Sequence, residues 1–236
     1  MPYQQTSRAQ LRVLVRERLG NAANTFWRDD ELNIAVINPA LRLFNLLTGF
    51  WKTRTTITTV ANQVWYALPS AITSNLRVTW QGYPLSPATF YDMDFGRAAW
   101  QSETTTSGGD VPSRPTLYVI GALNLLAIWP ADAPGNSQLV VDGIAATPFL
   151  ATDAQLLDLG QEELKGLLNC CQMLAVFKEG GKEFADSVEV FKAFLKSAGE
   201  RNSILRASAT YRSFLGLDRA RAQKPYKLSD DKVGAR

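Results

Sequence analysis

The residue types that most often do chemistry in proteins are scarce in this sequence. The 236-residue chain contains no histidine, which excludes a Ser-His-Asp triad, a Cys-His dyad and any zinc site with a histidine ligand. Its only two cysteines, Cys170 and Cys171, are adjacent. Neighbours on a helix point about 100° apart, which is poor geometry for a disulfide. We expect two reduced, mostly buried thiols in a chain made in a reducing compartment.

Paired carboxylates are the remaining candidates for catalysis. Asp92 and Asp94 could face the same way on an extended segment, whereas Glu162 and Glu163 fit the first turn of a helix, where the helix dipole favours acid. Such pairs arise by chance, and neither a phosphate-binding glycine loop nor an HExxH motif accompanies them. We therefore expect no catalytic residue, cofactor or metal. The alternative of a carboxylate-dependent hydrolase requires two carboxylates about 5–9.5 Å apart in a cleft.

Composition and charge place the chain among globular proteins with one basic end. Hydrophobic residues make up 46% and charged residues 20%, near the average for such proteins. The longest apolar run falls short of a membrane-spanning helix, and the polar N-terminal stretch lacks a signal core. From Glu200 to Arg236 there are nine basic and four acidic residues, so this segment has a net charge of +5, whereas the whole chain has a formal net charge of +3. The remainder of the chain is therefore slightly acidic.

Hydrophobic periodicity divides the chain into helical and strand-forming segments. We predict an α+β fold, in which a four-helix bundle has an antiparallel β-region inserted between its second and third helices. Residues 7–48 and 154–215 have helical patterns, and 53–148 have strand and loop patterns. The predicted divisions are a first helical half over 1–50, the β-region over 51–150, a second helical half over 151–215, and a basic tail over 216–236.

The helices show recognisable starts and seams. Ser7 and Gln10 form a capping box. Pro39 disfavours helix at Asn38, so we expect a kink there within a continuing helix. A third helix over 161–178 places Cys171 in the core. A fourth, longest helix is predicted from a coiled-coil-like seam, which packs within the subunit or in part on another subunit. The seam comprises Phe184, Val188, Phe191, Leu195, Ala198, Asn202, Leu205 and Ala209.

The β-region contains two hairpin signals and many aromatic residues. Gln81-Gly82 and residues 121–124 are the expected turns, and 104–110 is a loop by composition. The aromatic side chains either fill the core of a small sheet or, if exposed, stack on sugar rings as in a carbohydrate- or cell-wall-binding module. They are Trp65, Tyr66, Trp80, Tyr83, Phe90, Tyr91, Phe95, Trp100, Tyr118 and Trp129.

The basic C-terminal segment is a solvated tail or an arm that orders on a partner. Fully extended, residues 216–236 could reach roughly 70 Å at about 3.3–3.6 Å per residue. Aromatic and apolar side chains in this segment would anchor it, and its cations would steer it. The candidate docking residues are Tyr211, Arg212, Phe214, Arg219, Arg221, Lys224, Pro225, Tyr226 and Lys227.

The order of these elements resembles the head-to-tail connector, or adaptor, proteins of tailed bacteriophages. Three segments carry the likeness. The first is a helix that begins with Trp27 and an acidic cap and continues through Glu31-Leu32 and Asn38. The others are a strand that ends in an aromatic-Leu-Pro pattern at 65–69 and a Pro-rich strand start at 112–118. A helix pair split at Gly180-Gly181 and a basic tail complete it. Pro39 departs from the family pattern.

The resemblance implies a structural virion protein rather than an enzyme. Such proteins form rings, usually twelve-fold, below the portal protein at the head–tail junction, after assembly in the host cytoplasm. The ring would extend the channel through which packaged DNA passes without sequence-specific binding, and it would present a platform to tail or nozzle proteins. The final helix and tail would dock on the portal. No membrane partner is expected.

Overall fold

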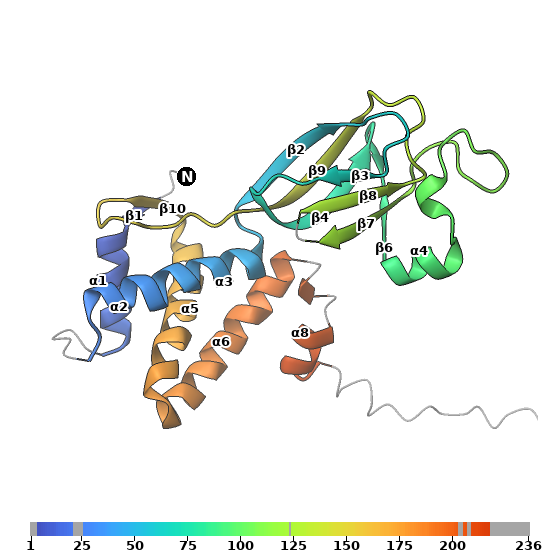
Figure 1. Ribbon diagram of the computed structural model, residues 1–236. Helices are drawn as coiled ribbons and strands as arrows, with labels where there is room; N and C mark the ends of the chain where they lie inside the picture. Colours follow the sequence, from blue (N-terminus) through green and yellow to red (C-terminus); the bar gives the residue numbers. More distant parts are fainter. Residues whose placement is uncertain (1–3, 21–25, 123, 203–204, 207–208, 218–236) are drawn as a thin grey trace, which may run out of the picture.

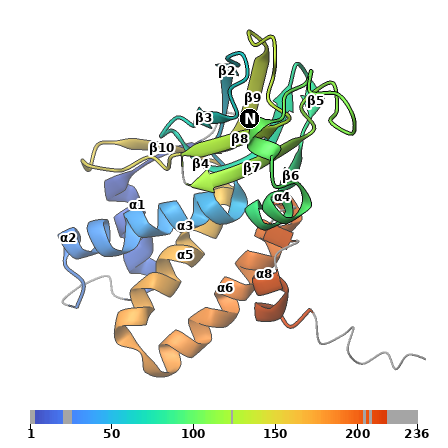
Figure 2. The same cartoon turned by 45° about the vertical axis from the view of Figure 1, so that its right-hand side comes forward.

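The computed structural model describes residues 4–20, 26–122, 124–202, 205–206 and 209–217. A helical part and a β part lie side by side (Figure 1), which confirms the mixed α+β class. Figure 2 shows the β part above the C-terminal ends of α3 and α6. The helical elements are α1 (Arg8–Arg18), α2 (Asp29–Glu31), η1 (Leu32–Ile37), α3 (Asn38–Thr48), α5 (Gln161–Glu179), α6 (Gly181–Arg201) and α8 (Ala209–Phe214).

The helical part is organised around α5. This helix contacts α1, η1, α3 and α6, and the buried side chains between them form one apolar core. Cys170 and Cys171 lie in that core as fully buried free thiols, as predicted. The more specific four-helix-bundle arrangement stays a prediction. Other core members are Leu11, Val15, Leu32, Ile37, Leu41, Phe44, Leu167, Phe191 and Leu195.

The start of α1 confirms the predicted capping box. The Ser7 hydroxyl accepts from the amide of Gln10 at 3.2 Å, and the amide of Ser7 donates to the Gln10 side chain at 2.8 Å. Two otherwise unpaired backbone amides are satisfied in this way.

The helix continues through Pro39, as predicted, although the geometry at Asn38 differs from the expectation. Asn38 keeps helical dihedral angles, φ −65° and ψ −42°, so the proline does not displace its neighbour from the helix. Instead the preceding segment η1 is a π-helix, and the amide of Asn38 bonds to the carbonyl of Asn33, five residues back. Pro39 occupies the first turn of α3, where a missing amide hydrogen costs little.

Two short strands occupy positions that the sequence pattern did not assign correctly. β1 (Gln4–Ser7) pairs antiparallel with β10 (Leu156–Leu159), so the prediction of helix from residue 154 is wrong at its start. Leu157 and Leu159 are buried while Leu156 and Asp158 are exposed. This two-residue alternation is the mark of a strand, and Gly160 then begins α5.

The predicted longest helix ends earlier than its seam. α6 stops at Arg201, and Asn202 has extended angles, φ −118° and ψ 97°. Its side chain accepts from the amide of Leu205 at 3.2 Å and donates to the carbonyl of Leu47 at 3.0 Å. A single helix through Ala209 is therefore wrong. Asn202, the one strongly polar residue of the seam, uses its amide group to end the helix.

The β part is a sandwich of two four-stranded sheets around an apolar core. The sheet orders are β2-β9-β4-β5 and β3-β8-β7-β6. Both predicted hairpins are present, and Gln81 and Gly82 have positive φ values of 47° and 83°. One pair, β6–β7, is parallel, so the β-region is not wholly antiparallel. The strands are β2 (Lys52–Thr58), β3 (Trp65–Ala67), β4 (Ile72–Trp80), β5 (Tyr83–Pro84), β6 (Ser86–Ala88), β7 (Leu117–Ala122), β8 (Leu125–Trp129) and β9 (Gln138–Ala145).

Two short helical elements also lie within the β part, η2 (Trp100–Ser102) and α4 (Phe90–Gly96). The extended segment expected around Asp92 and Asp94 is therefore wrong. Thr89 and Asp92 form a capping box at the start of α4. The Thr89 hydroxyl accepts from the amide of Asp92 at 3.1 Å, and the amide of Thr89 donates to the Asp92 carboxylate at 3.3 Å. This local bonding favours a helical turn over a strand.

The side-chain amides of two asparagines hold the junction between the two parts. Asn45 on α3 is fully buried. Its side chain donates to the carbonyl of Ala145 at 2.8 Å and accepts from the amide of Trp51 at 3.0 Å. The amide group of Asn38 brackets Leu150, accepting from its N–H at 2.9 Å and donating to its carbonyl at 3.3 Å. Both chain segments that cross between the parts are thus bonded to one helix.

Ion pairs between Asp153 and two arginines, here called the Asp153 clamp, fix α1 to the segment before β10. The Asp153 carboxylate accepts from Arg12 at 2.9 and 3.0 Å and from Arg8 at 2.6 and 2.9 Å. The hydrogen bonds from Arg12 and then Arg8 hold the pKa of Asp153 well below its usual range. Arg8 also donates to the carbonyl of Ala151 at 2.8 Å.

We predict that Asn45→Ala destabilises the fold by about 2–3 kcal/mol, because it leaves the Trp51 amide and the Ala145 carbonyl buried without this partner. Urea unfolding would measure the change. Asn124→Ala, at an exposed position of the β7–β8 turn, is the matched control and should stay within about 0.5 kcal/mol of the parent. An Asn45→Ala protein as stable as the control would contradict the role of the Asn45 hydrogen bonds in holding the junction.

The Asp153 clamp predicts a pH dependence with a definite sign. Because the pKa of Asp153 in the folded state lies below the ordinary aspartate value of 3.8, the stabilisation is present above about pH 4 and is lost as the pH falls below it. Asp153→Asn should therefore be less stable than the parent at pH 7 and lose less stability on going to pH 3. Urea midpoints at both pH values measure this. The control is Asp158→Asn, at an exposed position of β10; parallel pH profiles for the parent and Asp153→Asn would refute the clamp.

Candidate interaction surfaces

The described end of the C-terminal segment is attached to α6 by Tyr211. Tyr211 is only 7% exposed, and its hydroxyl lies 3.5 Å from the carbonyl of Lys196, to which it donates. The ring passes over Gly199, where an added Cβ would lie 2.5 Å from Cζ of Tyr211. The glycine is needed for this close approach, and Tyr211 packs in the helical core.

The candidate docking residues divide into three groups. Tyr211 is buried and Arg212 is half-buried. Phe214 is 46% exposed, with the Lys192 ammonium 5.9 Å from its ring centroid, and Leu217 is 51% exposed. Two apolar side chains therefore reach solvent where the basic segment begins. The remaining candidates lie outside the described residues: Arg219, Arg221, Lys224, Pro225, Tyr226 and Lys227.

A pair of aromatic rings on α4 forms a second exposed surface. The sequence left open whether these side chains fill the core or reach solvent, and they were not placed on one helical face. Tyr91 is 67% and Phe95 is 77% exposed, and their ring centroids are 4.3 Å apart. The signal was present in the sequence, because a Thr89–Asp92 capping box followed by aromatics four residues apart predicts one helical face. Large exposed aromatics of this kind are typical of binding surfaces.

Most of the other aromatic residues in the β part serve its core. Trp65 and Trp80 are half-buried, and Trp100 and Trp129 are buried. The exposed tryptophan face that a carbohydrate-binding module would use is therefore not formed by these four side chains. Tyr83 is 50% exposed, but the Arg114 guanidinium lies 4.4 Å from its ring centroid.

The acidic residues considered for catalysis have structural partners. Asp92 caps α4, and Asp94 accepts from the indole of Trp100 at 2.8 Å. Glu162 and Glu163 lie in the first turn of α5, as predicted. Their carboxylates accept from Arg201 at 3.1 and 2.7 Å, and the bond from Arg201 lowers the pKa of Glu163. These contacts join elements of the fold, so the residues of both carboxylate pairs have structural partners.

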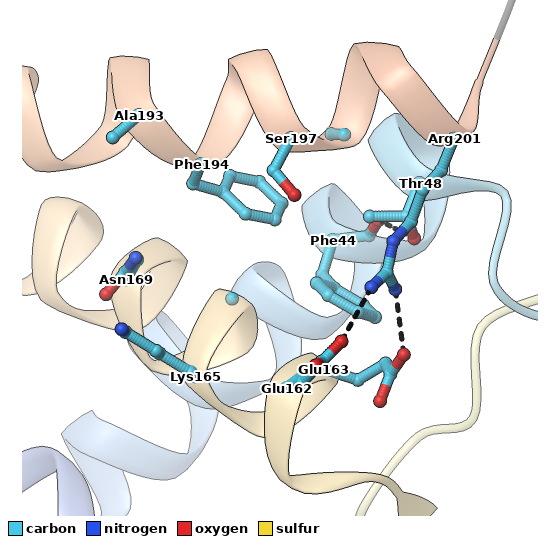
Figure 3. A pocket seen from close by; sticks show the side chains of 12 residues that line it. Phe44, Thr48, Glu162, Glu163, Lys165, Asn169, Ala193, Phe194, Ser197 and Arg201 are labelled. Carbon is cyan, nitrogen blue, oxygen red and sulfur yellow. Dashed lines mark hydrogen bonds and ion pairs between the residues drawn. The ribbon is translucent and has the colours of Figure 1, made fainter.

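A groove of about 350 Å³ opens between α3, α5 and α6. Figure 3 shows the rings of Phe44 and Phe194 at its floor and the bonds from Arg201 to the two glutamates across one end. The Phe44 and Phe194 rings stack with centroids 6.0 Å apart. Gly166 makes this possible, since an added Cβ would lie 3.0 Å from Phe194. The groove is lined by these rings together with the charged side chains of Glu162, Glu163, Lys165 and Arg201, and both glutamates are bonded to Arg201.

The described residues also bear on three other possibilities, namely reactive thiols, metal ligands and membrane-spanning helices. Burial raises the pKa of Cys171 to about 12 and also raises that of Cys170, which makes both thiols poor nucleophiles. No three His, Cys, Asp or Glu side chains gather as metal ligands within the described ranges. Among the same residues, no helix has the length and apolar character needed to cross a bilayer.

Comparison with known proteins gives one family match. The family model described as SU10 adaptor protein matches residues 6–222, which is most of the chain. No curated protein matches the sequence.

We predict that Gly199→Ala releases α8 from α6, because the new methyl group would occupy the space of the Tyr211 ring. Trypsin should then cut after Arg212 about tenfold faster for each 1.4 kcal/mol of attachment lost, as followed by mass spectrometry. Ser197→Ala, on an exposed position of the same helix, should digest like the parent. Equal digestion of the parent and Gly199→Ala would show that Tyr211 does not hold this segment.

Proposed function

The chain belongs to the SU10 adaptor protein family, and we propose that it forms a ring below the portal protein that joins the DNA-filled head of a tailed phage to its tail. The family match over residues 6–222 carries this proposal. The predicted family is thereby confirmed, and its role is structural rather than catalytic. In this proposal the ring extends the DNA channel and presents a platform to tail or nozzle proteins.

A ring of identical subunits needs two different, complementary surfaces on each copy. The helical part and the β part supply two surfaces of distinct character, and the Asn45 and Asn38 bonds support a fixed angle between them. The exposed Tyr91 and Phe95 on α4 are apolar anchors of the kind that interfaces bury. We propose that neighbouring copies or virion partners cover them, in a ring with twelve-fold symmetry as the family resemblance implies.

We further propose that the C-terminal segment docks on the portal. Tyr211 would fix the base of this arm to α6, while Phe214 and Leu217 would begin the contact surface. Pro225 and Tyr226 would provide further anchors, and the cations of the segment would steer it. Arg212, Arg219, Arg221, Lys224 and Lys227 are those cations.

The separate roles of the apolar anchors and the cations follow from the energetics of interfaces. Exposed ion pairs contribute about 0–1 kcal/mol each and weaken with salt, whereas a buried aromatic anchor contributes 2 kcal/mol or more. Charge would therefore speed the encounter, and the apolar side chains would set the lifetime of the complex.

We predict that deletion of residues 216–236 weakens binding to portal rings by at least about 30-fold, which corresponds to the loss of one 2 kcal/mol anchor. Co-sedimentation with portal rings measures binding, and circular dichroism should show an unchanged fold. Truncated protein that co-sediments at full strength would disprove the arm.

A matched pair of full-length variants separates the two contributions. Replacing Phe214 and Leu217 by Ala should raise the dissociation rate. Replacing Arg219, Arg221, Lys224 and Lys227 by Gln should mainly lower the association rate and its dependence on salt.

A further inference from the structure

One face of the β part carries positive charge that the fold does not neutralise. Arg54 on β2 and Arg77 on β4 are both in register with Asp142 on β9, so these three residues form one row across the sheet. Lys52 lies two residues before Arg54 on β2 and shares its face. With Thr53 and Gly143 they line an open cleft of about 520 Å³.

Three cations on this face meet a single carboxylate. Arg54 binds Asp142 through two hydrogen bonds, of 2.6 and 3.1 Å, yet its side chain stays 68% exposed. The side chains of Lys52 and Arg77 are exposed and make no hydrogen bond or ion pair with the described residues. The pKa of Asp142 is lowered by its bond from Arg54 and by the charges of Arg54 and Arg77, so the carboxylate stays ionised and offsets only one of the three positive charges.

The rest of this face is polar in a way that suits phosphate. Thr56 and Thr58 follow Arg54 on the exposed side of β2, and Ser74 on β4 is exposed. None of the large exposed apolar side chains of the described residues comes from β2, β4 or β9, whereas protein partners are usually held by such anchors. Arginine, lysine and hydroxyl groups are the side chains that contact the nucleic-acid backbone.

The spacing also fits an extended polyanion. Arg54 and Arg77 lie on strands separated by one other strand, which places them about 9.5 Å apart across the sheet, and Lys52 extends the charge along β2. The cations are thus spread over a surface, where they could reach different phosphates, and are not gathered around one point as in a small-anion pocket.

We propose that the outer face of the β2–β9–β4 sheet contacts the phosphate backbone of duplex DNA through Lys52, Arg54 and Arg77. The proposal rests on the proposed function in one respect, since it identifies the face that meets DNA in the channel. Two to three phosphate contacts give a weak, sequence-independent and salt-sensitive interaction, which would let DNA slide past.

Fluorescence anisotropy of labelled random-sequence duplex DNA with the full-length protein, between about 50 and 200 mM salt, tests this proposal. Lys52→Gln/Arg77→Gln removes the two unpaired cations and keeps the Arg54–Asp142 pair. We expect its DNA affinity to fall about tenfold at low salt and the slope of log K against log salt to become shallower by about 2. Asp142→Asn should act in the opposite direction and raise affinity severalfold.

A control separates this face from an effect of net charge. Lys182→Gln/Lys196→Gln removes the same charge from exposed positions of α6 and should bind DNA like the parent. An equal loss in both double variants would overturn the proposal, because the face would then have no special role. Displacement of DNA by polyglutamate from the parent, with no change in DNA affinity for Lys52→Gln/Arg77→Gln, would equally overturn it in favour of an acidic protein partner.

Portal binding distinguishes failure of this inference from failure of the proposed function. Lys52→Gln/Arg77→Gln should co-sediment with portal rings as the parent does, since the C-terminal segment is intact. Loss of portal binding in this variant would assign the face to a protein interface and would contradict the DNA contact.

Discussion

The arrangement of the molecule depends on the side-chain amides of two asparagines in the helix formed by η1 and α3. Asn45 bonds to both chain segments that pass between the helical and β parts, and Asn38 bonds to the returning segment further on. A buried amide with unpaired donors or acceptors would be costly, so these groups favour the one geometry in which every bond is made. The β part is therefore held at a defined angle to the helical core, as the proposed ring of identical subunits would require.

The residues that elsewhere would suggest chemistry are used here to join elements. Glu163 and Glu162 bind Arg201 between α5 and α6, Asp153 binds two arginines of α1, and Asp94 holds Trp100. What the described residues offer to the outside is different in kind: the aromatic pair of α4, the apolar end of the C-terminal segment, and the cationic face of the β2–β9–β4 sheet. Such features serve contact with other macromolecules, in agreement with the adaptor family.

Much of the fold could be predicted from local signals, and the errors have physical causes. The capping box at Ser7, the turn at Gln81-Gly82 and the buried cysteines follow from short-range bonding and periodicity, and all three are confirmed. β1 and β10 were not predicted because two short strands are stable only when paired across most of the chain length. The end of α6 depends on a bond from Asn202 to Leu47, a contact that no local pattern reveals.

The surfaces were harder to predict than the core, because exposure is decided by tertiary packing. Tyr211 and Phe214 are equivalent as sequence signals, yet one packs on Gly199 and the other reaches solvent. The row formed by Arg54, Asp142 and Arg77 depends on strand register, which joins residues far apart in sequence. The family resemblance, by contrast, rested on the order of elements along the chain and was confirmed over residues 6–222.

The most direct test of the account is the mass of the complex that this chain forms with portal rings, measured by native mass spectrometry on the mixture and on the chain alone. The account predicts a species whose mass equals one portal ring plus a full ring of copies of this chain. A chain that stays monomeric beside unmodified portal rings at saturating concentration would contradict it.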